Sequence, residues 1–358
     1  MSDLFATLPP SAFWRPGVVE NGPFGLAGLI QPKFPVTRES AVATAGSCFA
    51  QHVGRALRRA GIAVLDVEPA PRGLDAATAQ AYGFGLYSGR YGNIYTARQL
   101  HQLLDDCGTE TLRTEAVWQR DGRFFDALRP SVEPDGCASA AEVSALRRFH
   151  LGRLRGLFER TQLFVFTLGL TETWVDAATG TVFPSAPGVI AEPPLGRDVR
   201  FHNLSYTEVL GDLAAARKLL RQFNPALRMI LSVSPVPLTA SVSGRHVLVA
   251  NSASKAILRA AADEFSSTHP DVDYVPSYEI ITHPAARGRF YADNLRSVTQ
   301  AGVDLVMATF LQAHSLDTQP PQPSLGGEGS PQADDTTDPQ AHDEALVCEE
   351  ALVEAFLK

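Results

Sequence analysis

The chain has 358 residues, of which 45% are hydrophobic and 20% charged, and its formal net charge is −8. This is an ordinary globular composition, with length enough for one large domain or two modest ones. The negative charge argues against nonspecific binding to nucleic acid or to an anionic membrane. No apolar run is long enough to span a membrane, and no basic-then-apolar secretory signal opens the chain. We therefore expect a cytoplasmic protein.

The cysteines do not indicate a metal or redox site. The four of them are widely scattered, and none forms a Cys-x-x-Cys pair; they are Cys48, Cys107, Cys137 and Cys348. Free thiols in a reducing compartment are the simplest interpretation. We expect neither a metal nor an organic cofactor.

The first part of the chain predicts a β-α-β unit. Residues 1–37 are rich in proline, show no clear period and are expected to form an N-terminal arm. Residues 41–44 predict a strand, and residues 49–60 an amphipathic helix that Gly61 ends. A short apolar strand is expected over 62–65. Such a crossover helix is the building block of parallel sheets.

The rest of the chain alternates in the same way. Further helices are predicted over residues 96–106, 140–160, 206–223, 247–267 and 299–313. Apolar strands are predicted over residues 163–168, 228–233 and 272–276. Hairpins are expected over 117–125, centred on Asp121-Gly122, and over 174–183. This order predicts an α/β fold with a mostly parallel, doubly wound sheet and hairpin insertions.

We expect a main domain over residues 38–314. Residues 315–343 consist mostly of polar residues, Pro and Gly, which predicts a disordered linker. Residues 344–358 regain a helical period and predict a short C-terminal helix that docks on the domain or on a protein partner. Right-handed crossovers would bring Ser47, Gly169 and Ser234, which follow three strands, to one edge of the sheet.

Ser47 is the candidate nucleophile. It stands in Gly46-Ser47-Cys48, on the turn between the first strand and the first helix, where α/β proteins often place nucleophiles. Gly46 permits a sharp bend, and N–H groups at the helix start stabilise negative charge. Two alternatives stay open: Ser47 caps the helix, or Cys48 is the nucleophile in its place.

Polar residues follow other strands as well. Gly169 and Thr171 come after the long apolar strand, followed by Glu172. The loop that contains Gly92 and Asn93 offers a backbone N–H and a side-chain amide. A serine, a glycine N–H and an amide donor are the parts of an oxyanion hole.

The motif Gly46-Ser47-Cys48-Phe49-Ala50 resembles the signature of the GSCFA family. Further segments are similar to that family in the same order, over roughly residues 40–310; they are 82–87, 92–95, 167–172, 201–203, 234–236, 254–255 and 276–280. The family is regarded as a relative of the SGNH or GDSL hydrolases. The resemblance implies a flavodoxin-like three-layer α/β/α fold with Ser47 as nucleophile. It also implies esterase or acyltransferase activity, often on carbohydrate O-acyl groups.

A serine nucleophile needs a base, usually a histidine oriented by a carboxylate. SGNH proteins carry both in a late Asp-x-x-His motif. In the matching stretch here, Asn294 and Ser297 stand where the carboxylate and the histidine are expected. Other residues are therefore candidates. The candidate bases are His246, His202 and His283, and the candidate orienting carboxylates are Glu172, Glu279 and Asp293.

Two hypotheses of different class follow. In the first, which the resemblance implies, the protein is an SGNH-type esterase or acyltransferase that acts on O-acyl groups of a carbohydrate. Ser47 forms the acyl-enzyme, and the N–H groups of Ser47 or Cys48, with Gly92 and Asn93, stabilise the oxyanion. In the second, the protein is a noncatalytic module that binds a carbohydrate or acyl-sugar in the same pocket. The missing Asp-x-x-His favours the second.

Overall fold

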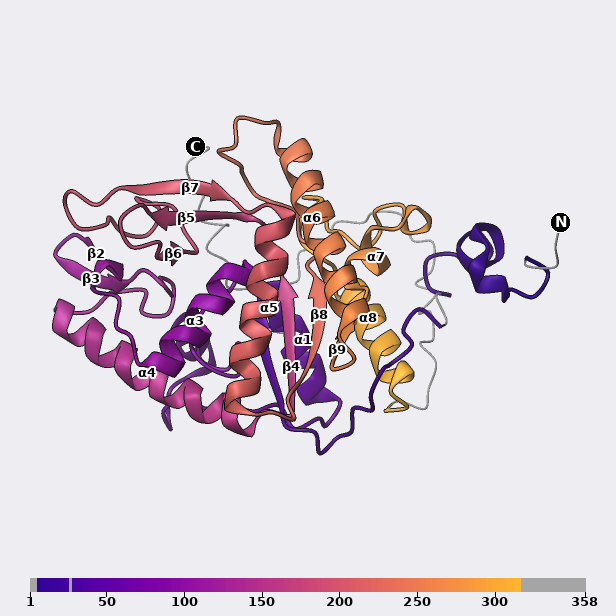
Figure 1. The fold of residues 1–358 in the computed structure, drawn as a ribbon, viewed down its shortest axis with the longest axis horizontal. Coiled ribbons are helices and arrows are strands. Elements are labelled where there is room, and N and C mark those ends of the chain that lie inside the picture. The colour runs from indigo at the N-terminus through magenta and orange to yellow at the C-terminus, as the bar shows by residue number, and fades with distance from the viewer. Residues whose placement is uncertain (1–4, 26–27, 317–358) are drawn as a thin grey trace, which may run out of the picture.

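A four-stranded parallel sheet in the order β1-β4-β8-β9 forms the centre of the fold (Figure 1). The computed structural model describes residues 5–25 and 28–316. The strands are β1 (Val42–Gly46), β4 (Leu163–Leu168), β8 (Arg228–Val233) and β9 (Val272–Tyr274). Helices cover both faces, so the predicted three-layer α/β/α class is confirmed. The proposed linker and C-terminal helix, from residue 317 onward, lie outside the described residues.

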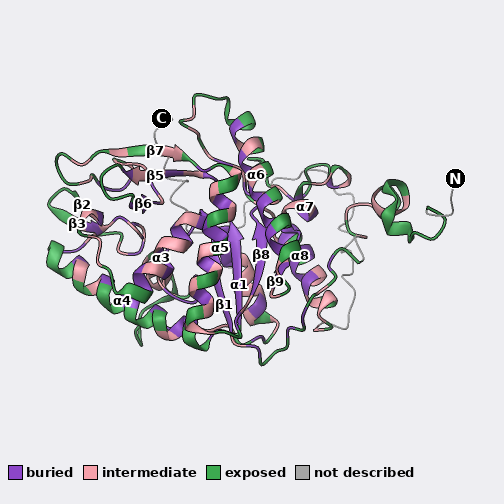
Figure 2. Ribbon diagram, in the orientation of Figure 1, coloured by how far each residue is buried: buried purple, intermediate pink, exposed green. Residues whose placement is uncertain are grey.

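Alternating side chains on the strands divide the interior into two cores. Phe164 and Phe166 of β4 face one core, whereas Leu163 and Val165 face the other. The first core packs against α3 (Ala97–Thr109), α4 (Ala140–Arg160), α5 (Tyr206–Phe223) and α6 (Val247–Thr268). The second packs against α1 (Phe49–Arg59), α7 (Ser277–Thr282) and α8 (Gln300–Ala313). Because both faces are covered, the strands are buried throughout (Figure 2).

Capping residues set the start of several helices. Thr96 accepts a hydrogen bond from the Gln99 N–H while Gln99 bonds back to Thr96, and Ser205 and Glu208 do the same for α5. These reciprocal bonds satisfy N–H groups that the first turn leaves without partners. The predicted helices therefore begin within a residue or two of the observed ones.

Two small antiparallel sheets are inserted between the elements of the main fold. One pairs β2 (Val117–Arg120) with β3 (Arg123–Asp126) across the predicted Asp121-Gly122 turn. Both turn residues have positive φ, 50° and 74°, as a tight hairpin turn requires. The other sheet has the order β6-β5-β7 and consists of β5 (Glu172–Asp176), β6 (Val182–Phe183) and β7 (Val199–Asn203).

The structure corrects two details of the prediction. Residues 62–65 do not form a strand, because only one parallel bridge, between Val42 and Val64, joins them to β1. Strand β7 was not predicted. The shorter helical elements, also unpredicted, are α7 and, in addition, α2 (Ala76–Ala81), η1 (Pro10–Ala12), η2 (Arg15–Val19), η3 (Thr114–Ala116) and η4 (Pro284–Ala286).

The N-terminal segment has two parts. Ile30, Phe34 and Val36 are buried in the second core. None of residues 5–25 is buried, and η1 and η2 project from the body of the molecule in Figure 1.

Gly46 ends β1 at a place where a side chain does not fit. Its φ is 141°, and a Cβ there would lie 2.5 Å from the Thr167 carbonyl oxygen of β4. We predict that Gly46→Ala lowers the free energy of unfolding by about 3 kcal/mol, because the backbone is strained and the strands are forced apart. Denaturant unfolding measures this loss. Gly152→Ala, at an open position in α4, is the control and should be neutral or stabilising by up to about 1 kcal/mol.

A buried pair of one histidine and one glutamate, His150 and Glu68, joins α4 to the segment that follows α1. His150 is fully buried, and its Nδ1 lies 2.7 Å from Glu68 Oε2. Burial, and then the charge of Arg129, lowers the pKa of His150 from 6.5 to about 4. Burial alone would raise the pKa of Glu68, but the hydrogen bond and charge of His150, the charge of Arg129 and the Arg90 N–H together outweigh it and bring that pKa to about 2. At neutral pH the pair is therefore a neutral imidazole that donates to a carboxylate.

This pair makes stability fall with acidification. Between pH 6.5 and about 4 the unfolded chain protonates His150 and the folded protein does not. The free energy of unfolding therefore falls by up to about 1.4 kcal/mol per pH unit in this window. In urea titrations at several pH values, His150→Gln should reduce the dependence of the unfolding free energy on pH by the equivalent of about one proton. An unchanged slope in His150→Gln would contradict this assignment.

Candidate active site

Ser47 lies on the turn from β1 to α1, at the carboxyl edge of the sheet. Its side chain is 3% exposed, and its Oγ has no hydrogen-bond partner within the described part of the chain. Its backbone N–H donates to the Thr167 carbonyl at 3.1 Å, which extends the pairing of β1 with β4 by one residue. The hydroxyl, unlike the backbone, is therefore left available for chemistry. It does not cap α1, because that helix begins with no side-chain cap.

A small hollow of about 10 Å³ lies beside Ser47, which is about the room that one water molecule needs. Residues that follow β1, β4 and β8 line it, together with Tyr95 from the segment before α3; they are Ser47, Cys48, Gly169, Leu170, Ser234, Val236, Pro237 and Leu238. The prediction that Ser47, Gly169 and Ser234 share one edge of the sheet is confirmed. In Figure 1 the arrows of β4 and β8 point toward this edge and toward the three-stranded sheet.

Gly169 forms the wall opposite Ser47. A Cβ at residue 169 would lie 2.9 Å from Ser47 Cβ and 3.2 Å from a ring carbon of Tyr95. The N–H groups of Gly169 and Leu170 both donate to the Tyr95 carbonyl, at 2.8 and 3.2 Å. The turn that follows β4 is therefore held directly against the serine.

Lys255 holds the other side of the same turn. Its side chain is 2% exposed, and Nζ donates to the Gly169 carbonyl at 2.6 Å. The neighbouring Ser254 Oγ accepts from the Thr171 N–H at 3.0 Å, and the Thr171 hydroxyl reaches Asn203 at 2.6 Å. Thr171 thus has a structural role beside the site. Burial of a lysine is costly, which makes this ammonium a notable neighbour of the serine turn.

The sequence analysis gives Lys255 no role beyond its place in the segments that resemble the family. Its position on the otherwise apolar, buried face of a helix was the feature that could have drawn attention to it. The helical period predicts that such a residue points inward, but it does not predict which carbonyl the side chain reaches.

Gly92 and Asn93 were predicted to hold the oxyanion. Asn93 is buried, and its Oδ1 accepts from Tyr87 Oη at 2.5 Å and from Gln51. Tyr87 Oη also lies 3.1 Å from the Ser47 carbonyl oxygen, so this network supports the serine turn. Gly92 faces Arg129 instead, whose Cβ would lie 3.6 Å from a Cβ at residue 92.

The candidate histidines do not line the hollow around Ser47. His202, on β7, is paired with Glu208 at 2.8 Å between Nε2 and Oε1. His246 is exposed, and its Nδ1 accepts the Leu248 N–H at the start of α6. Burial lowers the pKa of His283, which follows α7. The structure gives His202 and His246 local partners outside the hollow.

The carboxylate candidates lie in three different places. Glu279 is paired with Arg259 and accepts from Tyr274. Glu172, the first residue of β5, accepts from Ser241 Oγ at 2.6 Å, and burial raises its pKa. Asp293 is exposed on the turn that follows η4.

That turn is the counterpart of the late Asp-x-x-His motif. Counted from Asp293, its fourth residue is Arg296, so this frame also lacks the histidine. Asn294 accepts from the N–H groups of Arg296 and Ser297, at 3.0 and 2.9 Å, which shapes a tight turn. The preceding Tyr291 donates to the Pro235 carbonyl at 2.7 Å and anchors this segment beside Ser234.

A larger pocket of about 140 Å³ adjoins the hollow, with Leu170 and Leu238 common to the walls of both. It lies between the face of β5 and β7 and the loop before α6, and contains Glu172, Trp174 and Phe201. The site is thus a buried hydroxyl beside a deeper recess.

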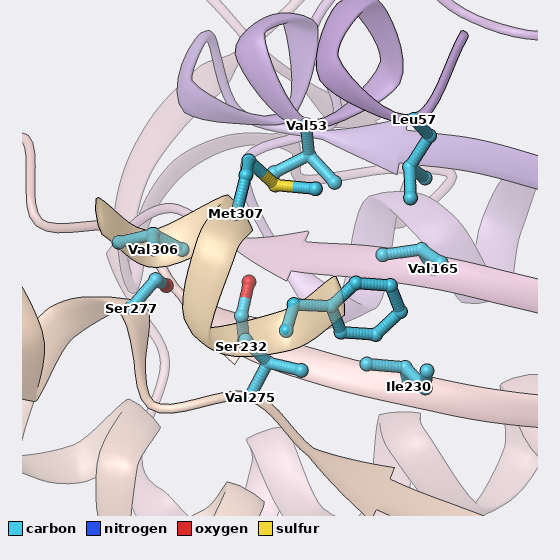
Figure 3. Close-up of a pocket in the computed structure, with 10 residues that line it drawn as sticks. Val53, Leu57, Val165, Ile230, Ser232, Val275, Ser277, Val306 and Met307 are labelled. Carbon is cyan, nitrogen blue, oxygen red and sulfur yellow. The ribbon is translucent and has the colours of Figure 1, made fainter. Parts of the chain in front are cut away.

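A further cavity, of about 20 Å³, lies in the second core, between the sheet and helices α1 and α8 (Figure 3). Figure 3 shows Val53 and Met307 facing the strand residues Val165 and Ile230. Its two hydroxyls are engaged, since Ser232 Oγ lies 3.0 Å from Thr167 Oγ1 and Ser277 donates to the Val233 carbonyl. Apolar walls and satisfied polar groups make it a packing defect rather than a site.

The sequence model of the GSCFA family matches residues 41–310, more than half of the 358 residues. The chain belongs to the GSCFA family. No curated protein matches it. In this GSCFA protein the described residues contain no cluster of His, Cys, Asp or Glu that would hold a metal ion. Over the same residues, none of the helices combines the length and apolarity that crossing a bilayer requires.

The packing of Gly169 against Ser47 leads to a test in this GSCFA protein. We predict that Gly169→Ala slows the reaction of Ser47 with a fluorophosphonate probe at least about tenfold, because the added methyl displaces the serine side chain. Intact-mass spectrometry over time measures the rate. Gly211→Ala, at an open position in α5, is the matched control and should react at the rate of the wild type. Equal rates for all three proteins would remove Gly169 from the site.

Proposed function

We propose that the protein is a serine esterase or acyltransferase of SGNH type that acts on O-acyl groups of a carbohydrate. The observation that carries the proposal is Ser47 itself. Its hydroxyl is buried at the carboxyl edge of a parallel sheet, has no partner in the described chain, and faces a hollow that adjoins a deeper pocket. A structural serine at such a depth would be expected to form a hydrogen bond.

The reaction has two steps. Ser47 Oγ attacks the acyl carbonyl carbon and gives its proton to a base; the ester C–O bond then breaks, and the leaving alkoxide takes up a proton. Water or a sugar hydroxyl next attacks the acyl-enzyme, which releases Ser47. The Cys48 N–H, at the start of α1, and the Asn93 amide are the proposed oxyanion donors. The Ser47 and Gly169 N–H groups bond to carbonyls of the protein.

We propose His246 or His202 as the general base, and Glu172 or Asp293 as the carboxylate that orients it. Both imidazoles would have to leave their present partners, the Leu248 N–H and the Glu208 carboxylate. Lys255 is a third candidate, because its Nζ donates to the carbonyl of Gly169, the residue that packs on Ser47; to act as the base, its amine would have to be neutral. Serine–lysine pairs are an established variant of this chemistry.

The second candidate function is a noncatalytic module that binds a sugar or acyl-sugar ligand. One observation favours it: among the described residues, neither an imidazole nor a carboxylate lines the hollow at Ser47. Such a module would keep the pocket and bind without turnover.

Covalent labelling separates these functions. We predict that a fluorophosphonate probe, and separately p-nitrophenyl acetate, adds one group to the wild type and none to Ser47→Ala, as intact mass will show. His246→Ala, His202→Ala and Lys255→Met are labelled in parallel, and the folded variant that loses the adduct identifies the base. A loss of about 10²–10⁴-fold in rate is expected for a true base.

Circular dichroism and thermal unfolding of each variant serve as the folding control. A wild-type protein that is folded and yet takes up no label from either reagent would refute the esterase and favour the binding module.

A further inference from the structure

The pocket beside Ser47 has polar groups that lack partners. Glu172 Oε1 is held by Ser241, whereas Oε2 has no hydrogen-bond partner among the described residues. Thr239 Oγ1 is buried, and within the same residues it too has no partner. A purely apolar ligand, such as an acyl chain, would bury both groups unsatisfied, which costs roughly 1–3 kcal/mol each. The pocket therefore favours an occupant that carries hydrogen-bond donors.

The opposite wall is aromatic. Trp174 of β5 pairs across the sheet with Phe201 of β7, and their rings meet edge to face with centroids 5.9 Å apart. Glu172 and Trp174 lie two residues apart on β5, so their side chains emerge on the same face of the sheet. The C–H face of a ring can lie on the aromatic side chains while its hydroxyls reach the carboxylate.

We propose that this pocket is a subsite for one neutral sugar ring, with Trp174 and Phe201 as its apolar wall. Glu172 and Thr239 accept hydrogen bonds from the hydroxyls of the ring. The volume of about 140 Å³ is well below the roughly 300–1,000 Å³ of pockets that enclose drug-sized ligands, and so suits a single ring.

The subsite gives the proposed reaction its orientation. Leu170 and Leu238 line both this pocket and the hollow at Ser47, so a ring in the pocket presents one substituent across them to the serine. The inference rests on the proposed function for that last step alone. Binding of the sugar is separable from it, because the titrations below measure binding without turnover, also for Glu172, which the proposed function names as one of two candidate orienting carboxylates.

Fluorine NMR of protein that carries fluorotryptophan tests the inference. The chain has three tryptophans, Trp14, Trp118 and Trp174, whose signals are assigned with single Trp→Phe variants. Glucose, galactose, mannose and N-acetylglucosamine are titrated separately, and octanoate represents an acyl chain. At least one sugar should shift the Trp174 signal in a saturable way and leave the other two unchanged.

Substitutions locate the binding. Glu172→Gln keeps the shape and removes the charge, and should weaken the sugar about tenfold; Thr239→Val, which removes only the hydroxyl, should weaken it about fivefold. Glu159→Gln, at an exposed position on α4, is the matched control and should bind as the wild type does.

The outcomes are distinct. A Trp174 shift with octanoate but with none of the sugars would overturn the inference in favour of an acyl pocket. A Trp174 signal that no probe moves would overturn it outright, and so would sugar binding that Glu172→Gln and Thr239→Val leave unchanged. Ser47→Ala is titrated as well: sugar binding by this variant, together with a wild type that takes up no label, would support the subsite while refuting the esterase.

Discussion

The close approach of β1 and β4 at their carboxyl ends is the constraint on which the site depends. Gly46 pairs with Thr167, and the Ser47 N–H continues the pairing to the Thr167 carbonyl. Gly169, the residue after β4, then packs against the serine side chain. A side chain at either glycine would separate the strands or displace the serine. The position of the hydroxyl therefore follows from main-chain geometry and needs no hydrogen bond of its own.

Lys255 adds a charge to this arrangement. An ammonium that is 2% exposed is stabilised only by the groups it contacts, and one of these is the Gly169 carbonyl. The same helix supplies Ser254 to the Thr171 N–H, so α6 holds the turn at two successive residues. A positive group next to the serine turn also favours negative charge nearby, as an oxyanion or an ionised nucleophile would provide.

Strand and helix positions were largely predictable, because periodicity and capping are local. The strand at 163–168 and the starts of the helices predicted from 96 and 206 lie within a residue of their observed places. The prediction of a strand at 62–65 was wrong. The apolar pattern of this segment is that of a strand, but in the folded chain it forms only one bridge to β1, between Val64 and Val42. The local sequence does not determine how far a segment pairs with its neighbour in the sheet.

The positions of site residues were predictable where the strand topology determines them. The hydrogen-bond partners of their side chains were not. Ser47, Gly169 and Ser234 meet because parallel strands end at one edge. The pairing of His202 with Glu208, six residues away, depends on side-chain directions at the β7–α5 junction, which sequence spacing does not give. The roles of Lys255 and Thr239 depend on which carbonyl or cavity each reaches across the fold.

The segment after η4 shows how the site is bounded without an Asp-x-x-His pair. Tyr291 ties it to the Pro235 carbonyl, next to Ser234 in the wall of the hollow, and Asn294 keeps its turn tight. A segment that is anchored in this way closes the β8 side of the site whether or not it supplies a base. The base can therefore come from another element without loss of the architecture around Ser47. In this chain the segment that encloses the site therefore carries Ser297 where the histidine of the motif is expected.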